Sequence, residues 1–264
     1  YSSQGLNDMS QTLHRLYRRR LARGYWRDRE RPILINNWEA TYFNFTEEKL
    51  LQLASRAQKC GIELFVLDDG WFGARSSSKA GLGDWEANRD RLPNGLSGLA
   101  QKIEALGMKF GLWIEPEMVN PDSDVARAHP DWVLRPTANR LPMQGRSQQV
   151  LDLTNPDAYR YIHDSIDALV GELGIDYIKW DANRHAENAG SEFLPKDRQS
   201  HFWIDYVQGF YKVMERIRAK YADVLIQACA SGGGRVEYGA MKYFNEVWTS
   251  DNTEALSRTR IQYG

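Results

Sequence analysis

The sequence predicts an α/β fold, a (β/α)8 TIM barrel that is truncated before its last strands. Amphipathic helices alternate with short apolar strands, and short links between such units favour a parallel sheet. Nearly every strand ends in polar or acidic residues, whereas in an open doubly wound sheet only strands near the switch point carry site residues. Six strands are clear, or seven if Val150–Leu153 is one, and the chain ends at Gly264 soon after the last.

The predicted elements share a simple logic. Each helix places apolar residues at helical spacing, and several end at a glycine, which tolerates the left-handed conformation found there. Asn155 and Pro156 form an N-cap with proline at the first helical position. In chain order we expect strand Pro32–Asn36, helix Glu47–Lys59, strand Ile62–Leu67, helix Leu99–Leu106, strand Lys109–Ile114, a helix from Pro156 ending at Gly174, strand Ile175–Trp180, helix Phe202–Tyr221, strand Val224–Ala228 and strand Val247–Ser250.

The domain organisation is simple. We expect one catalytic barrel domain over residues 32–264, incomplete at its C-terminal end, and a leading helix with a lead-in segment over residues 1–31. The basic run Arg15–Arg23 has apolar residues interleaved, so it is interpreted as the solvated face of that helix, and a binding patch is the minority alternative.

Composition excludes several classes of protein. The 34 Lys and Arg and 35 Asp and Glu give a net charge of −1, which argues against a nucleic-acid or anionic-membrane surface. Two cysteines are too few for a disulfide scaffold. No apolar stretch is long enough to cross a bilayer and no signal peptide is visible, which favours a cytoplasmic protein, although the chain begins with Tyr1 rather than Met.

Two aspartates far apart in the chain, Asp181 and Asp251, each follow a predicted strand directly. The carboxyl ends of barrel strands meet on one face, so both carboxylates can face one pocket. Paired carboxylates are the usual means of hydrolysing a glycosidic bond, so we interpret the chain as a glycosidase. Lys179 shares a strand face with Asp181 and should keep that carboxylate charged. The alternatives are a structural ion pair for Lys179 and a helix N-cap for Asp251.

Other polar and aromatic residues lie at strand ends. Asp68 and Asp69 can offer four oxygens to vicinal hydroxyls, or they can form a plain turn. Glu115 and Glu117 are expected to support the site or to line its rim. Arg146 is either a surface residue or a donor to a hydroxyl. The tryptophans that could stack on a sugar ring, with core packing as the alternative, are Trp38, Trp71 and Trp113.

The turn Cys229–Gly234 contains three glycines, which let a backbone approach a ligand closely. With Arg235 it could form an anion-binding nest, but no phosphate-binding or dinucleotide motif accompanies it. A thiol nucleophile at Cys229 is disfavoured because no histidine follows a strand to activate it. Metal ligation by the acidic residues is a further alternative, but HExxH and CxxC are absent. We therefore expect no metal and no cofactor.

Taken together, these segments resemble the bacterial α-galactosidases of glycoside hydrolase family 36. The resemblance covers essentially the whole chain, and its specificity comes from all the motifs occurring in this order. The motifs are Ile35-Asn36-Asn37-Trp38-Glu39-Ala40-Thr41, Asp68-Asp69-Gly70-Trp71-Phe72, Leu112-Trp113-Ile114-Glu115-Pro116-Glu117, Leu151-Asp152-Leu153-Thr154-Asn155-Pro156, Tyr177-Ile178-Lys179-Trp180-Asp181-Ala182-Asn183-Arg184, Cys229-Ala230-Ser231-Gly232-Gly233-Gly234-Arg235 and Trp248-Thr249-Ser250-Asp251-Asn252.

The resemblance implies a retaining, metal-independent enzyme with Asp181 as nucleophile and Asp251 as acid/base. It implies substrates that carry a terminal α-galactose, such as melibiose and raffinose-type oligosaccharides, and a possible homo-oligomer, because bacterial relatives are often tetramers. Full-length members carry two additional β-domains, which this chain lacks. The residues implied to contact galactose are Asp68, Asp69, Trp113, Arg146, Lys179, Asn183, Cys229 and Gly232.

Other functions remain open at this point. A raffinose-synthase-type transglycosylase would use the same residues, and an α-N-acetylgalactosaminidase is disfavoured because the turn from Cys229 to Gly232 should crowd the sugar 2-position. A metal-dependent barrel hydrolase or lyase and an inactive sugar-binding module are alternatives from other classes.

Overall fold

The computed structural model describes residues 4–137, 139–142, 144–187 and 189–263. Residues 1–3 of the predicted lead-in segment and Gly264 of the predicted barrel domain lie outside them. Six strands form one parallel sheet in the order β1-β2-β3-β6-β7-β8, as the repeated helix–strand units predict. They are β1 (Leu34–Asn36), β2 (Leu64–Leu67), β3 (Lys109–Ile114), β6 (Tyr177–Trp180), β7 (Leu225–Ala228) and β8 (Glu246–Val247).

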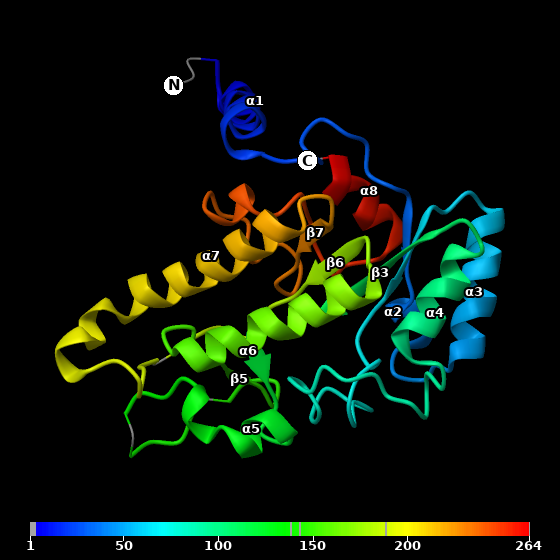
Figure 1. Ribbon diagram of the computed structural model, residues 1–264. Helices are drawn as coiled ribbons and strands as arrows, with labels where there is room; N and C mark the ends of the chain where they lie inside the picture. Colours follow the sequence, from blue (N-terminus) through cyan, green and yellow to red (C-terminus); the bar gives the residue numbers. More distant parts are fainter. Residues whose placement is uncertain (1–3, 138, 143, 188, 264) are drawn as a thin grey trace.

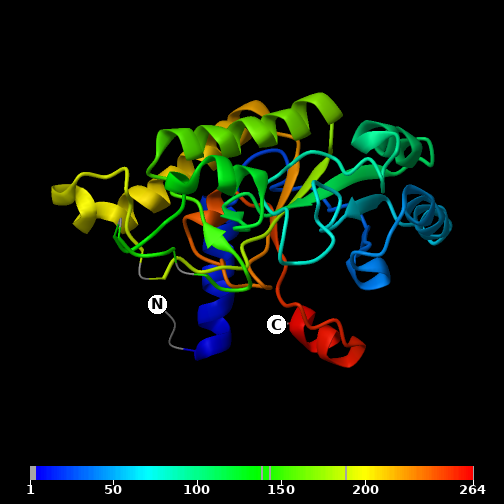
Figure 2. The same ribbon diagram turned by 90° about the horizontal axis from the view of Figure 1, so that it is seen from below.

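Helices α3 (Glu47–Lys59), α4 (Gly95–Glu104), α6 (Pro156–Asp167) and α7 (Phe202–Lys220) lie on the outer side of this sheet (Figures 1 and 2). Helices α3 and α4 pack against each other, and so do α6 and α7. The helices are α1 (Leu6–Leu16), α2 (Trp38–Thr41), α3 (Glu47–Lys59), α4 (Gly95–Glu104), α5 (Asp124–Ala128), α6 (Pro156–Asp167), α7 (Phe202–Lys220) and α8 (Ala255–Tyr263). Short π-helical segments are Tyr17–Leu21 and Ala168–Glu172, and 3-10 turns are Pro130–Trp132, Lys196–His201 and Ala240–Lys242.

Local sequence explains where the helices begin and end. The Thr46 side chain accepts a hydrogen bond from the Lys49 backbone N–H and caps α3. Gly61, with φ of +82°, follows that helix in the left-handed region. Asn155 caps α6 by accepting from the Asp157 N–H, with proline at the first helical position, as the sequence predicts.

Both faces of the sheet are buried, because residues alternate between two apolar clusters. Phe65, Leu67, Ile178 and Ile226 point to the main core beneath the helices. Residues of the opposite parity form a smaller cluster on the inner face, named here the interior cluster: Leu64, Val66, Tyr177 and Leu225, with Trp26 and Leu34 packed against it. Such alternation is expected of barrel strands, whose inner side chains fill the interior.

The segment around Val150 does not join the main sheet. Instead β5 (Gln149–Val150) pairs antiparallel with β4 (Met118–Val119) in a separate two-stranded sheet. The seventh barrel strand that Val150–Leu153 could have supplied is therefore excluded. The last barrel strand is also shorter than the predicted Val247–Ser250, because its pairing with β7 ends at Val247.

The N-terminal segment stands away from the sheet (Figure 1). No residue of α1 or of Tyr17–Leu21 is buried. The Tyr17 hydroxyl donates to the Tyr238 hydroxyl at 2.9 Å, and this contact joins the segment to the loop after β7. Among the residues that the structure describes, no helix combines the length and apolarity needed to span a membrane.

Candidate active site

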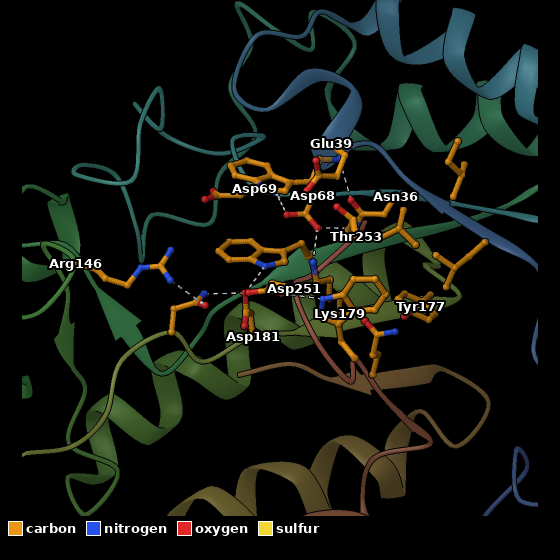
Figure 3. Close-up of a pocket in the computed structure, with 18 residues that line it drawn as sticks. Asn36, Glu39, Asp68, Asp69, Arg146, Tyr177, Lys179, Asp181, Asp251 and Thr253 are labelled. Carbon is orange, nitrogen blue, oxygen red and sulfur yellow. Dashed lines mark hydrogen bonds and ion pairs between the residues drawn. The ribbon is translucent and has the colours of Figure 1, made fainter. Parts of the chain in front are cut away.

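A cavity of about 450 Å³ opens at the carboxyl ends of the strands, on the inner face of the sheet. It brings together nine of the eleven predicted site residues, from segments spread over the whole chain (Figure 3). These nine are Trp38, Asp68, Asp69, Trp113, Arg146, Lys179, Asp181, Asn183 and Asp251. Cys229 and Gly232 are the two that do not line it.

Asp181 follows β6 at the centre of the sheet, and its carboxylate is held by hydrogen-bond donors on several sides. The Trp113 indole N–H donates to Oδ2 at 3.0 Å, and the Asn183 amide donates to the same oxygen at 2.7 Å. The Ala182 backbone N–H donates to Oδ1 at 2.9 Å. The residue is only 6% exposed. These contacts fix the orientation of a carboxylate that faces the cavity.

Lys179 points into the cavity with Asp181, as its strand position predicts, but its ion pair is with Asp68. Its Nζ donates to Asp68 Oδ2 at 2.9 Å, across the sheet interior from β6 to the end of β2. Asp68 Oδ2 also accepts from the Asn36 amide. Burial lowers the pKa of Lys179, but the charges of Asp68, Cys229 and Asp181 and the hydrogen bond to Asp68 together raise it by more, so the pKa lies above its usual value. Lys179 therefore stays charged and orients Asp68.

Asp69 is held from behind the cavity by a buried arginine. Arg75 Nε and Nη2 donate to the two carboxylate oxygens of Asp69, each at 2.8 Å. Burial raises the pKa of Asp69 above its usual value, although the hydrogen bonds and charge of Arg75 act in the opposite direction. This bidentate geometry fixes the plane of the Asp69 carboxylate.

Asp251 comes from the end of the sheet after β8 and reaches the same cavity as Asp181. Its Oδ1 accepts from the Trp248 indole N–H at 2.8 Å. It does not cap α8, because Glu254 accepts from the Leu256 and Ser257 N–H groups there. Asp251 is exposed, since no described strand lies beside β8 on that side.

The tryptophans at the strand ends differ in burial. Trp71 is fully buried and donates its indole N–H to the Trp113 carbonyl, so it belongs to the core. Trp113 is stacked on Phe72 and is only 3% exposed, and its polar edge faces Asp181. Trp38 is half-buried and lines the cavity. Of the three, Trp38 offers the most accessible ring to a ligand.

Arg146 reaches the cavity from the loop that precedes β5. Its Nη1 lies 3.4 Å from Asn183 Oδ1 and 3.5 Å from Ser231 Oγ. Arg146 and Ser147 both adopt the left-handed region, with φ of +56° and +59°. Non-glycine residues rarely adopt this region, because each such residue costs about 1–3 kcal/mol and persists only where the surrounding structure imposes the conformation.

The glycine-rich turn after β7 does not form a free anion site. Arg235 binds Glu117 in the structure, with Nη1 2.6 Å from Oε1. Cys229 is buried behind the cavity, and burial together with the charge of Asp181 raises the pKa of its thiol. A Cβ at Gly232, where φ is +89°, would lie 2.9 Å from the Ser250 Cα. Gly232 thus lets this turn pack against the segment that carries Asp251.

Glu115 is a fully buried carboxyl next to the site. It accepts from the Asn183 backbone N–H and from the Gln148 amide, the latter at 2.9 Å. Burial and the nearby charge of Asp181 raise the pKa of Glu115 to about 8. Gln148 Oε1 is buried and has no hydrogen-bond partner. A protonated Glu115 can donate to that oxygen if the Gln148 amide is turned over.

We predict that Glu115→Gln removes a pH dependence of stability. The pKa of Glu115 is about 8 in the folded protein, above the value of 4.5 for a free carboxyl, so the folded state binds the proton more tightly. The wild type should therefore lose stability as the pH rises from about 5 to about 8.5, by roughly 2–5 kcal/mol. Glu115→Gln should lack this loss.

Urea unfolding of both proteins at pH 5.5 and pH 8.5 measures the effect. Glu117→Gln is the matched control. It weakens the ion pair with Arg235 and should destabilise the protein at both pH values. An identical pH slope in the wild type and in Glu115→Gln would contradict the prediction.

Sequence reasoning missed several cavity residues. Gln227 lies beside Lys179 in the register of β6 and β7 and lines the cavity. It lies two residues before Cys229, so strand alternation puts both residues on the same face and could have predicted Gln227. Its amide and the Tyr177 hydroxyl both donate to Glu246, each at 2.8 Å. Trp248 and Thr253 flank Asp251, where no periodicity marks them. The missed lining residues are Leu34, Ile35, Asn36, Glu39, Val66, Tyr177, Gln227, Trp248 and Thr253.

An inward cavity lined by carboxylates at the carboxyl ends of parallel strands is the arrangement typical of glycosidases with a barrel fold. The model of the melibiase family matches residues 1–264. The chain therefore belongs to the melibiase family, glycoside hydrolase family 36. The predicted family is thus confirmed.

Several relatives are similar over the whole chain. The α-galactosidase AgaA of Geobacillus stearothermophilus is 53% identical over 264 residues, which are 100% of this chain and 36% of AgaA. An α-galactosidase of Escherichia coli is 42% identical over 265 residues, 100% of this chain and 36% of that protein. The chain thus spans about a third of the length of these relatives.

Solved structures agree. The crystal structure of AgaA has a TM-score of 0.95 with this chain and covers it completely at 53% identity, with 36% of AgaA matched. A variant of AgaA in complex with raffinose has the same TM-score at 52% identity, with the same coverage of both chains. The predicted barrel fold, of which this chain supplies a part, is confirmed by these matches.

Proposed function

We propose that the protein is a retaining α-galactosidase that removes terminal α-D-galactosyl residues from oligosaccharides of the raffinose type. The observation that carries the proposal is the convergence of Asp181 and Asp251 on one cavity within a melibiase-family fold. Relatives named α-galactosidases are up to 53% identical over the whole chain, and AgaA variants were solved with raffinose and stachyose. These sugars end in the unit that the proposed site would hold.

The proposed reaction is a double displacement. Asp251 gives a proton to the departing glycosidic oxygen while Asp181 attacks the anomeric carbon from the opposite face, so the bond to the leaving group breaks as a galactosyl ester forms. Water then attacks the same carbon, Asp251 takes its proton, and the Asp181 carboxylate leaves. Asp181 is well suited to be the nucleophile, because three hydrogen-bond donors already fix the orientation of its carboxylate.

The remaining cavity residues would bind the galactose. Asp68 and Asp69 offer carboxylate oxygens to hydroxyl groups, and Lys179 and Asn183 offer donors from the other side of the cavity. Arg146 and the ring of Trp38 would form the rim. Contacts by Cys229 and Gly232 stay predictions, since neither residue lines the cavity.

Hydrolysis of p-nitrophenyl α-galactoside by the full-length protein tests the proposal, with the first anomer released followed by NMR. We expect α-galactose to appear first and to convert to the β anomer only by mutarotation, with full activity in EDTA. Initial release of β-galactose, or no turnover, would overturn the proposal. Comparing products with and without sucrose acceptor separates hydrolysis from transglycosylation.

We also propose that the protein forms homo-oligomers. The outer side of α7 exposes Trp203, Ile204 and Val207, which are 52%, 58% and 42% exposed. Adjacent exposed apolar side chains favour a protein–protein contact. Light scattering of the full-length protein should give a mass that is a multiple of one chain, and a monomer at micromolar concentration would contradict this.

A further inference from the structure

Asn120 is a fully buried amide that follows β4, outside the cavity, and its hydrogen-bonding capacity is completely used. Its Oδ1 accepts from Arg75 Nη1 at 2.7 Å and from the Leu82 N–H at 2.9 Å. Its Nδ2 donates to the Ser147 carbonyl at 2.7 Å and to the Ser78 carbonyl at 3.2 Å. A carboxylate of the same shape could accept but not donate, so this set of partners requires an amide.

The side-chain oxygen of Asn120 is connected to Asp69 through Arg75. Arg75 is 1% exposed, and a buried guanidinium needs partners for its remaining N–H groups as well as for its charge. Nε and Nη2 bind Asp69, while Nη1 binds Asn120 and the Ala80 carbonyl. Asn120 thus helps to fix the Arg75 guanidinium, which in turn orients the Asp69 carboxylate toward the cavity.

The side-chain NH2 group of Asn120 is connected to Arg146 through the Ser147 carbonyl. Ser147 and Arg146 are held in the left-handed region, which is unfavourable for both residues. The bond from Asn120 to the Ser147 carbonyl and the bond from Gln148 to Glu115 anchor the two residues that follow Arg146. The Arg146 side chain then reaches Asn183, whose amide donates to Asp181.

We propose that Asn120 is a positioning residue that fixes two parts of the cavity wall at once, Asp69 through Arg75 and Arg146 through Ser147. The inference rests on the proposed function, because the cavity must bind a substrate for positioning to affect turnover. A single buried amide then sets the geometry of two side chains that line the cavity and come from different loops.

A double-mutant cycle in the full-length protein tests this inference. Asn120→Asp keeps the acceptor for Arg75 and Leu82 but loses both donors, so it should release the Arg146 loop selectively. We expect kcat/KM for p-nitrophenyl α-galactoside to fall about tenfold. In an Arg146→Ala background the same substitution should change kcat/KM less than about twofold, since its effect passes through Arg146. Independent effects that multiply would overturn the inference.

A second pair of variants avoids the buried site. Ser147→Pro forces φ from +59° to about −65° and should displace the loop, whereas Ser147→Gly suits the left-handed conformation and should not. We expect Ser147→Pro to lower kcat/KM as much as Arg146→Ala does, and Ser147→Gly to match the wild type. Wild-type turnover by Ser147→Pro would overturn the inference.

Amide hydrogen exchange separates this inference from the proposed function. The Gln148 N–H donates to the Gly145 carbonyl within the loop. Its exchange should be faster in Asn120→Asp than in the wild type, whether or not the protein turns over galactosides. A wild type without α-galactosidase activity would defeat the proposed function, whereas unchanged exchange would defeat the role of Asn120.

Discussion

Asp181→Ala should lower the hydrolysis of aryl α-galactosides by the full-length protein by about 10⁴-fold or more, because no covalent intermediate can form without the carboxylate. The position is fixed by the central strand β6 and by the donors Trp113, Asn183 and Ala182. Removing the side chain leaves these donors in place and opens space on the face from which the nucleophile attacks. The fold should therefore persist while the chemistry is lost.

Added azide should restore turnover of Asp181→Ala and give β-galactosyl azide. Azide enters where the carboxylate stood, attacks the anomeric carbon and displaces the aryl alcohol. Asp176→Ala is the matched control, because Asp176 lies just before the opposite end of β6 and binds Lys109 at the surface. It should keep nearly full activity. Rapid hydrolysis by Asp181→Ala without azide would contradict the assignment of Asp181 as the nucleophile.

Asp251→Ala should have an effect that depends on the leaving group. Raffinose releases a poor leaving group that needs a proton, so we expect its hydrolysis to fall about 10²–10⁴-fold. A p-nitrophenolate can leave unassisted, so the first step on that substrate should slow much less and the galactosyl-enzyme should accumulate. A burst of p-nitrophenol in a stopped-flow experiment measures this difference.

Azide distinguishes the two aspartates. In Asp251→Ala it should attack the galactosyl-enzyme from the face opposite Asp181, displace that carboxylate and give α-galactosyl azide. Glu254→Ala is the control. This neighbouring carboxylate caps α8, so its removal should weaken the start of that helix without loss of turnover. The same azide anomer from both catalytic variants would contradict the assigned roles.

The sequence was sufficient for features that depend on local periodicity. The two-residue spacing of Lys179 and Asp181 predicts one shared strand face, and both residues line the cavity. The parallel strands followed from the alternation with helices, and their order from β1 to β8 agrees with that expectation.

Features that depend on distances across the barrel could not be predicted. Lys179 binds Asp68 rather than Asp181, because the partner is decided by how β2 and β6 face each other. The exposure of Asp251 follows from its place at the edge of the sheet, which no residue near it encodes. Asn120 carries no motif, and its contacts come from segments as distant as Arg75 and Ser147.

The interior cluster closes the amino-terminal side of the cavity. Leu64, Val66, Tyr177 and Leu225 fill the inside of the sheet below the carboxylates, and Tyr177 and Gln227 are tied together there through Glu246. The cavity therefore has a largely apolar base, and the carboxylates that could bind a sugar lie above it at the carboxyl ends of the strands.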